Sequence, residues 1–240
     1  MDLLAITGLR ADGRKPGELR RSRCELGVVP GADGSAMLET GNTRVAASVR
    51  GPREVVSGTQ TGVVVTVSYA AFAGSDRRRT DHRDRRAVEV AAQLEAALNA
   101  VVQTALFPRS RVDVMAHVLQ TDGAVPAVCF NACVLALVDA GVPVVDMCAA
   151  CSVGVVDRTP LLDPIHAEVT SGGGAELWVS CLSRSGGVVS AQLAGRVAPA
   201  TLRELVRQAQ LGCAELNQVL GAFVRDAVQE QMQATEFLEA

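Results

Sequence analysis

Aromatic side chains are scarce in this sequence, making up only 3% of its residues. The interior must therefore be built mainly from Val, Leu and Ala, and a hydrophobic content of 48% in 240 residues is ample for a core. The sequence also lacks an apolar run of the roughly 18 residues that a membrane span requires. Its first residues, MDLLAITGLRADGRK, lack the basic start and long apolar centre of a signal peptide. We therefore expect an intracellular globular protein that does not associate with membranes.

Patterns of metal ligands are missing as well. The sequence has seven cysteines, mostly in apolar segments. Only Cys148 and Cys151 have the Cys-x-x-Cys spacing, and no second pair or histidine cluster accompanies them. A structural zinc site needs four ligands, usually from two such groups. We expect buried free thiols, no metal and no cofactor.

Lysine is nearly absent too, so arginine carries almost all of the basic charge. Six of residues 77–86, RRRTDHRDRR, are arginine, and a second basic group occupies residues 10–23. The net charge is nevertheless −3. Local arginine clusters on an acidic protein are typical of contact with phosphate or nucleic acid on one surface. The alternative is that a charge run is simply a solvated loop.

The sequence predicts strands and helices in alternation. Alternating and β-branched residues predict strands over residues 25–29, 36–40, 43–49, 62–70, 111–120, 144–156 and 161–162, and a hairpin over residues 175–193. Apolar residues at helical spacing predict helices over residues 86–106 and 127–140, and a long one from residue 201, which opens with a capping box. This order predicts a layered domain of the α+β (α/β layered) class.

The centre of the chain is the stretch VLQTDGAVPAVCFNACVLALVDAGVP, residues 118–143. Asp122 and Gly123 predict a tight turn between a strand and a helix, and Pro126 suits a first helical turn. The helix is apolar on nearly all sides, so it must be covered on several faces. A turn of this kind points free backbone N–H groups at its surroundings, which favours an anion there.

A series of short motifs, taken in order over nearly the whole chain, resembles the RNase PH family and in particular the ring subunits of the eukaryotic exosome. The motifs are LRADGR (9–14), GELR (17–20), ADGSA (32–36), GNT (41–43), GPRE (51–54), PRS (108–110), LQTDG (119–123), NA (131–132), LVDAGVP (137–143) and TPLLD (159–163). The resemblance implies an RNase PH-like fold, related to domain 2 of ribosomal protein S5, with two βαβα halves. It implies a single domain over residues 1–240, with a basic N-terminal arm (1–24) and a C-terminal helix (199–240).

The chemistry that the resemblance implies is phosphorolysis of RNA from its 3′ end. Active members carry a second glycine after the Asp-Gly pair, then a Thr or Ser next to an arginine that grips phosphate. Here this segment is Gly123-Ala124-Val125-Pro126, without the hydroxyl and without the arginine. A proline also removes an N–H from the helix start.

The resemblance also implies a pair of aspartates, six residues apart, of which this chain keeps only one. Asp163 is present, and Val169 stands at the second position. We interpret Asp163 as a vestigial catalytic residue. Glu168 beside the gap and His166 in the same loop are the remaining candidates for acid or base work.

A basic pair just ahead of the first long helix faces the RNA channel in ring subunits of this family. Arg85 and Arg86 match that pair, and Arg83 and Arg79 extend it. Arginine contacts to phosphate bind RNA without reading its sequence. We therefore expect these four residues to bind RNA.

Three functional hypotheses follow from the resemblance. The first, favoured by the missing residues, is a subunit that is not an enzyme and forms part of the RNA channel. The second is an active phosphorolytic 3′-to-5′ exoribonuclease, and the third a homohexameric enzyme acting on tRNA 3′ ends. The implied partners are other RNase PH-like exosome subunits in a hetero-hexameric ring, cap subunits with RNA-binding domains, an associated hydrolytic exoribonuclease and single-stranded RNA. The implied roles are rRNA maturation and mRNA turnover in the nucleus, nucleolus and cytoplasm.

Overall fold

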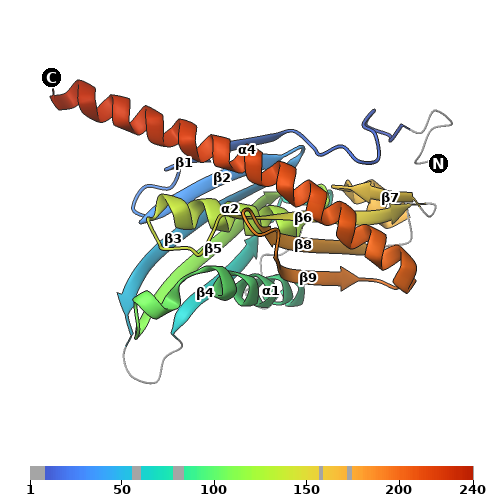
Figure 1. Ribbon diagram of the computed structural model, residues 1–240, viewed down its shortest axis with the longest axis horizontal. Helices are drawn as coiled ribbons and strands as arrows, with labels where there is room; N and C mark the ends of the chain where they lie inside the picture. The colour runs from blue at the N-terminus through green and yellow to red at the C-terminus, as the bar shows by residue number, and fades with distance from the viewer. Residues whose placement is uncertain (1–8, 56–60, 78–83, 157–158, 172–174, 240) are drawn as a thin grey trace.

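The computed structural model describes residues 9–55, 61–77, 84–156, 159–171 and 175–239. Two β-sheets lie in separate layers, and helices α1 and α2 pack between them, while the long helix α4 crosses the outer side of the second sheet (Figure 1). The layered α+β class that the sequence predicts is confirmed.

The first sheet has five strands in the order β1-β2-β3-β5-β4. The strands are β1 (Ser22–Leu26), β2 (Gly34–Thr40), β3 (Thr43–Glu54), β4 (Gly62–Tyr69) and β5 (Ser110–Gln120). Strands β1, β2, β3 and β5 pair antiparallel, whereas β4 and β5 are parallel and are joined through α1 (Arg85–Val101). The carboxyl ends of β4 and β5 therefore open at the same edge of the sheet, where α1 and α2 begin.

The second sheet has four strands in the order β7-β6-β8-β9. The strands are β6 (Cys148–Val156), β7 (Thr159–Leu162), β8 (Glu176–Leu182) and β9 (Val188–Ala194). Side chains of alternate residues point to opposite faces of a strand. On β6 and β8, the face that includes Cys151 and Val179 meets α4, whereas the face that includes Ser152 and Trp178 points toward the helices between the sheets.

Helix α2 (Val125–Asp139) is the centre of the core, as its apolar sequence predicts. Of its residues, twelve are buried, and it contacts strands of both sheets. Its one buried polar side chain, Asn131, both donates to the carbonyl of Ala150 (2.9 Å) and accepts from the N–H of Ala150 (2.6 Å). These two bonds attach α2 to β6 at Ala150, which lies outside the stretch of β6 that pairs with β7. Gly34 lets α2 approach β2 closely, because a Cβ there would lie 2.2 Å from the backbone nitrogen of Ala140.

The remaining helices are η1 (Thr104–Leu106), α3 (His166–Ser171) and α4 (Pro199–Glu239). The pattern of the sequence did not indicate α3. Its predicted first helix, over residues 86–106, ends early at Val101, because the chain leaves the helical conformation at Val102. None of the helices in the described part of the chain is long and apolar enough to cross a membrane.

Candidate active site

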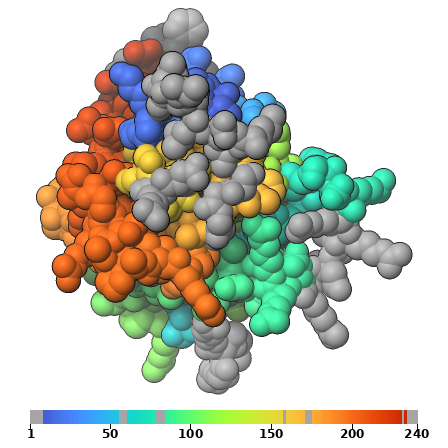
Figure 2. Space-filling view, turned by 90° about the vertical axis from the view of Figure 1, so that its right-hand side faces the viewer, coloured from blue at the N-terminus to red at the C-terminus, as the bar shows by residue number. Residues whose placement is uncertain are grey.

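A pocket of about 650 Å³ lies at the edge where β4 and β5 end. It is bounded by the loop after β4, the start of α1, the turn between β5 and α2, helix α3, and the ends of β8 and β9. On the face in Figure 2, the beginning of α1 (green) lies beside the orange residues near β9 and the start of α4, and the loop after β4 (turquoise) projects to the right of them. Ligands commonly bind at the carboxyl ends of parallel strands, because helix N-termini and loops gather there.

The turn between β5 and α2 forms one wall of this pocket. Gly123 has φ +83°, and a Cβ there would lie 2.4 Å from the carbonyl oxygen of Pro164, so only glycine fits. Ala124 follows in the left-handed conformation and precedes the first helical residue, Val125, without a capping side chain. Pro126 lies in the first turn, as predicted. The first N–H groups of a helix have no partner within it, so this wall of the pocket attracts anions.

Asp122 of the same turn has a positioning role. Its Oδ2 accepts from Nδ2 of Asn42 (3.0 Å), and its Oδ1 accepts from the backbone N–H of His166 (3.4 Å). Asp122 thereby connects the turn between β2 and β3 to the start of α3.

Asp163, the carboxylate that the family resemblance singles out, is buried beside the pocket and bound to Arg20. Nη2 of Arg20 lies 2.6 Å from Oδ1, and Nε lies 2.8 Å from Oδ2. Asp163 has φ +51°, a conformation in which aspartate is one of the tolerated residues. Both oxygens are engaged in this ion pair, which attaches the N-terminal segment to the residue that follows β7; the vestigial role of Asp163 stays a prediction.

Glu168 is likewise withdrawn from the pocket. Its side chain is fully buried in α3 and paired with Arg10, whose Nε lies 2.8 Å from Oε1. Oε2 also accepts from the N–H of Ile165 (2.9 Å). Glu168 therefore does not replace the acid that is missing at Val169, although Val169 and His166 themselves line the pocket.

These two ion pairs change the interpretation of the N-terminal basic group. Arg10 and Arg20 are buried, at 3% and 7% exposure, and Arg10 also donates to the carbonyl of Leu162 (2.6 Å). A nucleic acid cannot reach either guanidinium. Their positive charge balances buried carboxylates that lie about 150 residues later in the chain.

Glu176, the first residue of β8, lines the pocket together with Asp76, Glu89 and Asp122. Its Oε1 is buried without a well-formed hydrogen bond among the described residues. Burial raises the pKa of Glu176, while the nearby Ser152 hydroxyl and the charge of Arg86 act in the opposite direction. A carboxyl group held in a pocket with a raised pKa is a candidate general acid.

Sequence reasoning missed Glu176 because it counted six residues onward from Asp163. That count ends at Val169 in α3, whereas Glu176 lies in the following strand, β8. A signal was available, because Glu176 is the only charged residue in ELWVSCL and alternates with Trp178 on the inward face of the strand.

The predicted RNA-binding arginines lie partly at this pocket. Arg85 and Arg86 are exposed at the start of α1, where the side chain of Asp84 caps the helix by accepting from the N–H of Arg86 (3.1 Å). Arg86 lines the pocket with Glu176. Arg79 and Arg83 lie outside the described residues. The RNA-binding role of all four stays a prediction.

No group of three or more His, Cys, Asp or Glu side chains that could hold a metal ion occurs in the part of the chain that the structure describes. Carboxylates that include Glu176, the guanidinium of Arg86 and the N-terminus of α2 lie around one pocket.

Comparison with known proteins identifies the family. The model of the RNase PH domain, described as domain 1 of the 3′ exoribonuclease family, matches residues 18–143. The chain is 38% identical to exosome complex component RRP41 of Bos taurus, covering 96% of both chains. It is 37% identical to the RRP41 homolog of Arabidopsis thaliana over the full length of both, and 34% identical to Rrp41 of the archaeon Methanopyrus kandleri over 88% of this chain and 90% of that one.

Solved structures show the same fold at lower identity. Rice Rrp46 superposes with a TM-score of 0.76 at 22% identity, covering 88% of this chain and 98% of that one. A chain of the Archaeoglobus fulgidus exosome with RNA bound to the active site superposes with a TM-score of 0.78, also at 22% identity, covering 88% and 92%. The predicted RNase PH-like fold is confirmed.

One prediction from the sequence is wrong. The residues missing at Pro126 and Val169 led us to expect a protein that is not an enzyme, but the matching family is one of 3′ exoribonucleases and the relatives are RRP41 subunits. The expectation rested on spacing along the chain, which does not show which acidic side chains the fold brings to the pocket; Asp76, Glu89, Asp122 and Glu176 line it. This chain belongs to the RNase PH family of 3′ exoribonucleases, and its relatives are the RRP41 components of the exosome.

Proposed function

We propose that this chain is a ring subunit of an RNA exosome and that its pocket shortens single-stranded RNA from the 3′ end by phosphorolysis. The match to the 3′ exoribonuclease family and the RRP41 relatives support the ring and the reaction class. The observation that carries the proposal is that Glu176, with its raised pKa, shares one pocket with Arg86 and the N-terminus of α2.

Each part of the pocket has a task in this reaction. Inorganic phosphate binds between Arg86 and the free N–H groups at the start of α2. A phosphate oxygen attacks the phosphorus of the last phosphodiester bond, and the bond from phosphorus to the 3′ oxygen of the preceding nucleotide breaks. Glu176 donates its proton to that leaving oxygen. The products are a nucleoside diphosphate and RNA shortened by one nucleotide.

The phosphate site in this scheme has fewer donors than the family pattern supplies. Val125 and Pro126 stand where active members have a hydroxyl and an arginine, and a proline contributes no N–H. We therefore expect weak phosphate binding, with Arg86 as the principal cation.

The path of the RNA follows from the same arrangement. Arg85 and Arg86 stand side by side at the N-terminus of α1, exposed to solvent, and arginine remains charged at any physiological pH while matching phosphate oxygens with two donors. In the proposed ring, Arg85 contacts the RNA backbone in the channel and Arg86 contacts it within the pocket. Other RNase PH-like subunits form the rest of the ring, and cap subunits with RNA-binding domains and a hydrolytic nuclease associate with it.

The test uses a ring isolated from cells through a tagged copy of the full chain. Its subunits are identified by mass spectrometry, and the ring is incubated with 5′-labelled single-stranded RNA, with and without inorganic phosphate. We expect RNase PH-like neighbours and release of nucleoside diphosphates that requires phosphate.

A matched pair of variants assigns the activity to this chain. Glu176→Gln keeps the shape of the side chain and removes the proton donor, so release of nucleoside diphosphates falls by at least about 100-fold. Glu215→Gln makes the same change on the exposed surface of α4 and has no effect. Equal activity in both variants, or release of nucleoside monophosphates without phosphate, contradicts the proposal.

A further inference from the structure

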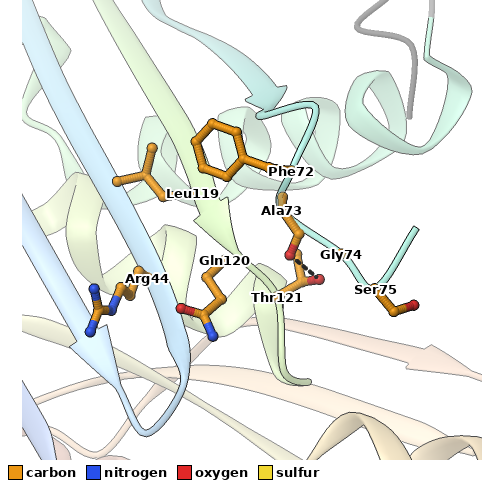
Figure 3. Close-up of a pocket in the computed structure, with 8 residues that line it drawn as sticks. All are labelled: Arg44, Phe72, Ala73, Gly74, Ser75, Leu119, Gln120 and Thr121. Carbon is orange, nitrogen blue, oxygen red and sulfur yellow. Dashed lines mark hydrogen bonds between the residues drawn. The ribbon is translucent and has the colours of Figure 1, made fainter. Parts of the chain in front are cut away.

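A second hollow, of about 510 Å³, adjoins the pocket on the other side of the loop that follows β4. The two share residues Ala73, Gly74, Ser75 and Thr121, so one wall separates them. A chain that leaves the pocket across this wall therefore enters the hollow directly. In Figure 3, Phe72 and Leu119 lie at one end of the hollow, and Arg44 and Gln120 lie side by side along it.

Phe72 is an unusual residue for this surface. It is 73% exposed, the highest value among the exposed large apolar residues of the described chain. Only 3% of the residues are aromatic, so the core has few large rings, and an aromatic side chain on the surface is notable. An aromatic ring left in water, rather than in the core, points to a surface that binds something.

The backbone beside Phe72 is held firmly. The carbonyl of Ala73 accepts two hydrogen bonds from Thr121, one from the backbone N–H at 2.8 Å and one from Oγ1 at 3.0 Å. On the other side of Phe72, the N–H of Ala70 donates to the carbonyl of Val118 (2.9 Å), and the N–H of Ala73 donates to Ala70 (3.0 Å). The ring is thus presented from a fixed turn, and a flat ligand loses little free energy in ordering it.

The polar side of the hollow comes from two strands. Arg44 of β3 and Gln120 of β5 are direct cross-strand partners. Nε of Arg44 lies 3.3 Å from Oε1 of Glu39 in a partly exposed ion pair, and the two terminal nitrogens of Arg44 have no further partner among the described residues. The Gln120 amide also has none among them. An amide offers both a donor and acceptors to the edge of a base, and a guanidinium suits a phosphate.

We propose that this hollow is a subsite for one nucleotide of single-stranded RNA upstream of the 3′ end. The base stacks on Phe72, the amide of Gln120 meets the base edge or the ribose, and Arg44 pairs with the adjoining phosphate. This assignment rests on the proposed function, because it assumes that the RNA strand runs from the pocket across the shared wall into the hollow. The subsite keeps hold of the strand while the terminal nucleotide is removed.

The experiment measures binding of the full-length chain to oligoribonucleotides that each contain a single abasic ribose, moved one position at a time from the 3′ end. Phosphate is omitted so that the RNA stays intact, and affinity is read from fluorescence polarisation. For the unaltered chain we expect one upstream position at which loss of the base weakens binding by about tenfold to a hundredfold. In Phe72→Ala, loss of the base at that position no longer weakens binding, whereas in Phe72→Tyr it still does. Arg44→Gln weakens binding at every position and lowers the salt dependence.

Several outcomes overturn the assignment. One is an abasic profile that is the same in the unaltered chain and in Phe72→Ala. Another is that Phe72→Ala leaves RNA binding unchanged but no longer co-purifies with ring subunits, which assigns the hollow to a protein contact. If phosphate-dependent RNA shortening persists in either case, the subsite alone fails and the proposed function stands. Absence of all RNA binding by the folded chain overturns both. Because Phe72 is mostly exposed, its variants retain the thermal unfolding temperature of the unaltered chain.

Discussion

Arg20 and Asp163 lie 143 residues apart in the sequence and form a buried bidentate ion pair, with Nη2 to Oδ1 at 2.6 Å and Nε to Oδ2 at 2.8 Å. The backbone N–H of Arg20 also donates to Oδ2, at 3.1 Å. The carboxylate that resembles a catalytic residue is thus occupied with joining the N-terminal segment to the end of β7. In the proposed function, stability and catalysis therefore depend on different carboxylates, Asp163 and Glu176.

The first prediction concerns this ion pair. Asp163→Asn keeps the shape and tolerates the positive φ but leaves the Arg20 charge buried without a partner, so the free energy of unfolding falls by about 3–5 kcal/mol. Urea denaturation measures it. Asp12→Asn is the control, because Asp12 pairs with Arg14 near the surface and such a pair contributes at most about 1 kcal/mol. Equal losses in the two variants would show that Asp163 is not a structural carboxylate.

The second prediction is that Glu176→Gln stabilises the fold while it removes activity. Burial raises the pKa of Glu176 in the folded state, so the unfolded chain holds fewer protons once pH exceeds the ordinary glutamate value. The folded state is therefore favoured at low pH, and this advantage is lost as pH rises through the folded pKa. At pH 7 the thermal unfolding temperature of the variant should be higher than that of the unaltered chain, and the difference between the two temperatures should become smaller toward pH 4. A difference that widens on acidification would contradict the raised pKa.

The third prediction separates the two adjacent arginines. Arg86 lowers the pKa of Glu176, so Arg86→Gln raises that pKa further and moves the alkaline limb of the pH–rate profile to higher pH. Arg85→Gln leaves the profile in place, because Arg85 is not among the residues that line the pocket. Both variants weaken RNA binding and reduce its salt slope by about 1. If the pH–rate profile shifts equally in the two variants, Arg86 does not act in the pocket in a way that Arg85 does not.

The fourth prediction tests the phosphate site. Pro126→Arg adds a guanidinium and a backbone N–H in the first turn of α2, so the KM for phosphate falls by about tenfold to a hundredfold, the range of a hydrogen bond to a charged group. Pro126→Ala restores only the N–H and has a smaller effect in the same direction. Initial rates at a series of phosphate concentrations measure both. An unchanged KM in Pro126→Arg would mean that phosphate does not bind at this end of the helix.

Much of the layered fold can be predicted because its strongest determinant is local. A helix that is apolar all around, such as α2, must be covered on more than one side, and the β-branched strand β4 is equally clear. Charge is harder to interpret, because a pattern of arginines is the same whether its partners are phosphates or distant carboxylates. Arg10 and Glu168 meet only through the tertiary fold. Glu176 was missed for a related reason, since the position of a pocket residue is set by the sheet and not by its distance along the chain from another acid.

The long separation of the paired residues also has a consequence for synthesis on the ribosome. Arg10 leaves the ribosome 158 residues before Glu168, an interval of about 8–30 s at ordinary elongation rates. Throughout that time Arg10 lacks its carboxylate partner, and the nascent chain carries two guanidinium groups that the finished protein buries. The segment ahead of β1, which is made first, is therefore fully secured only after most of the chain has been made.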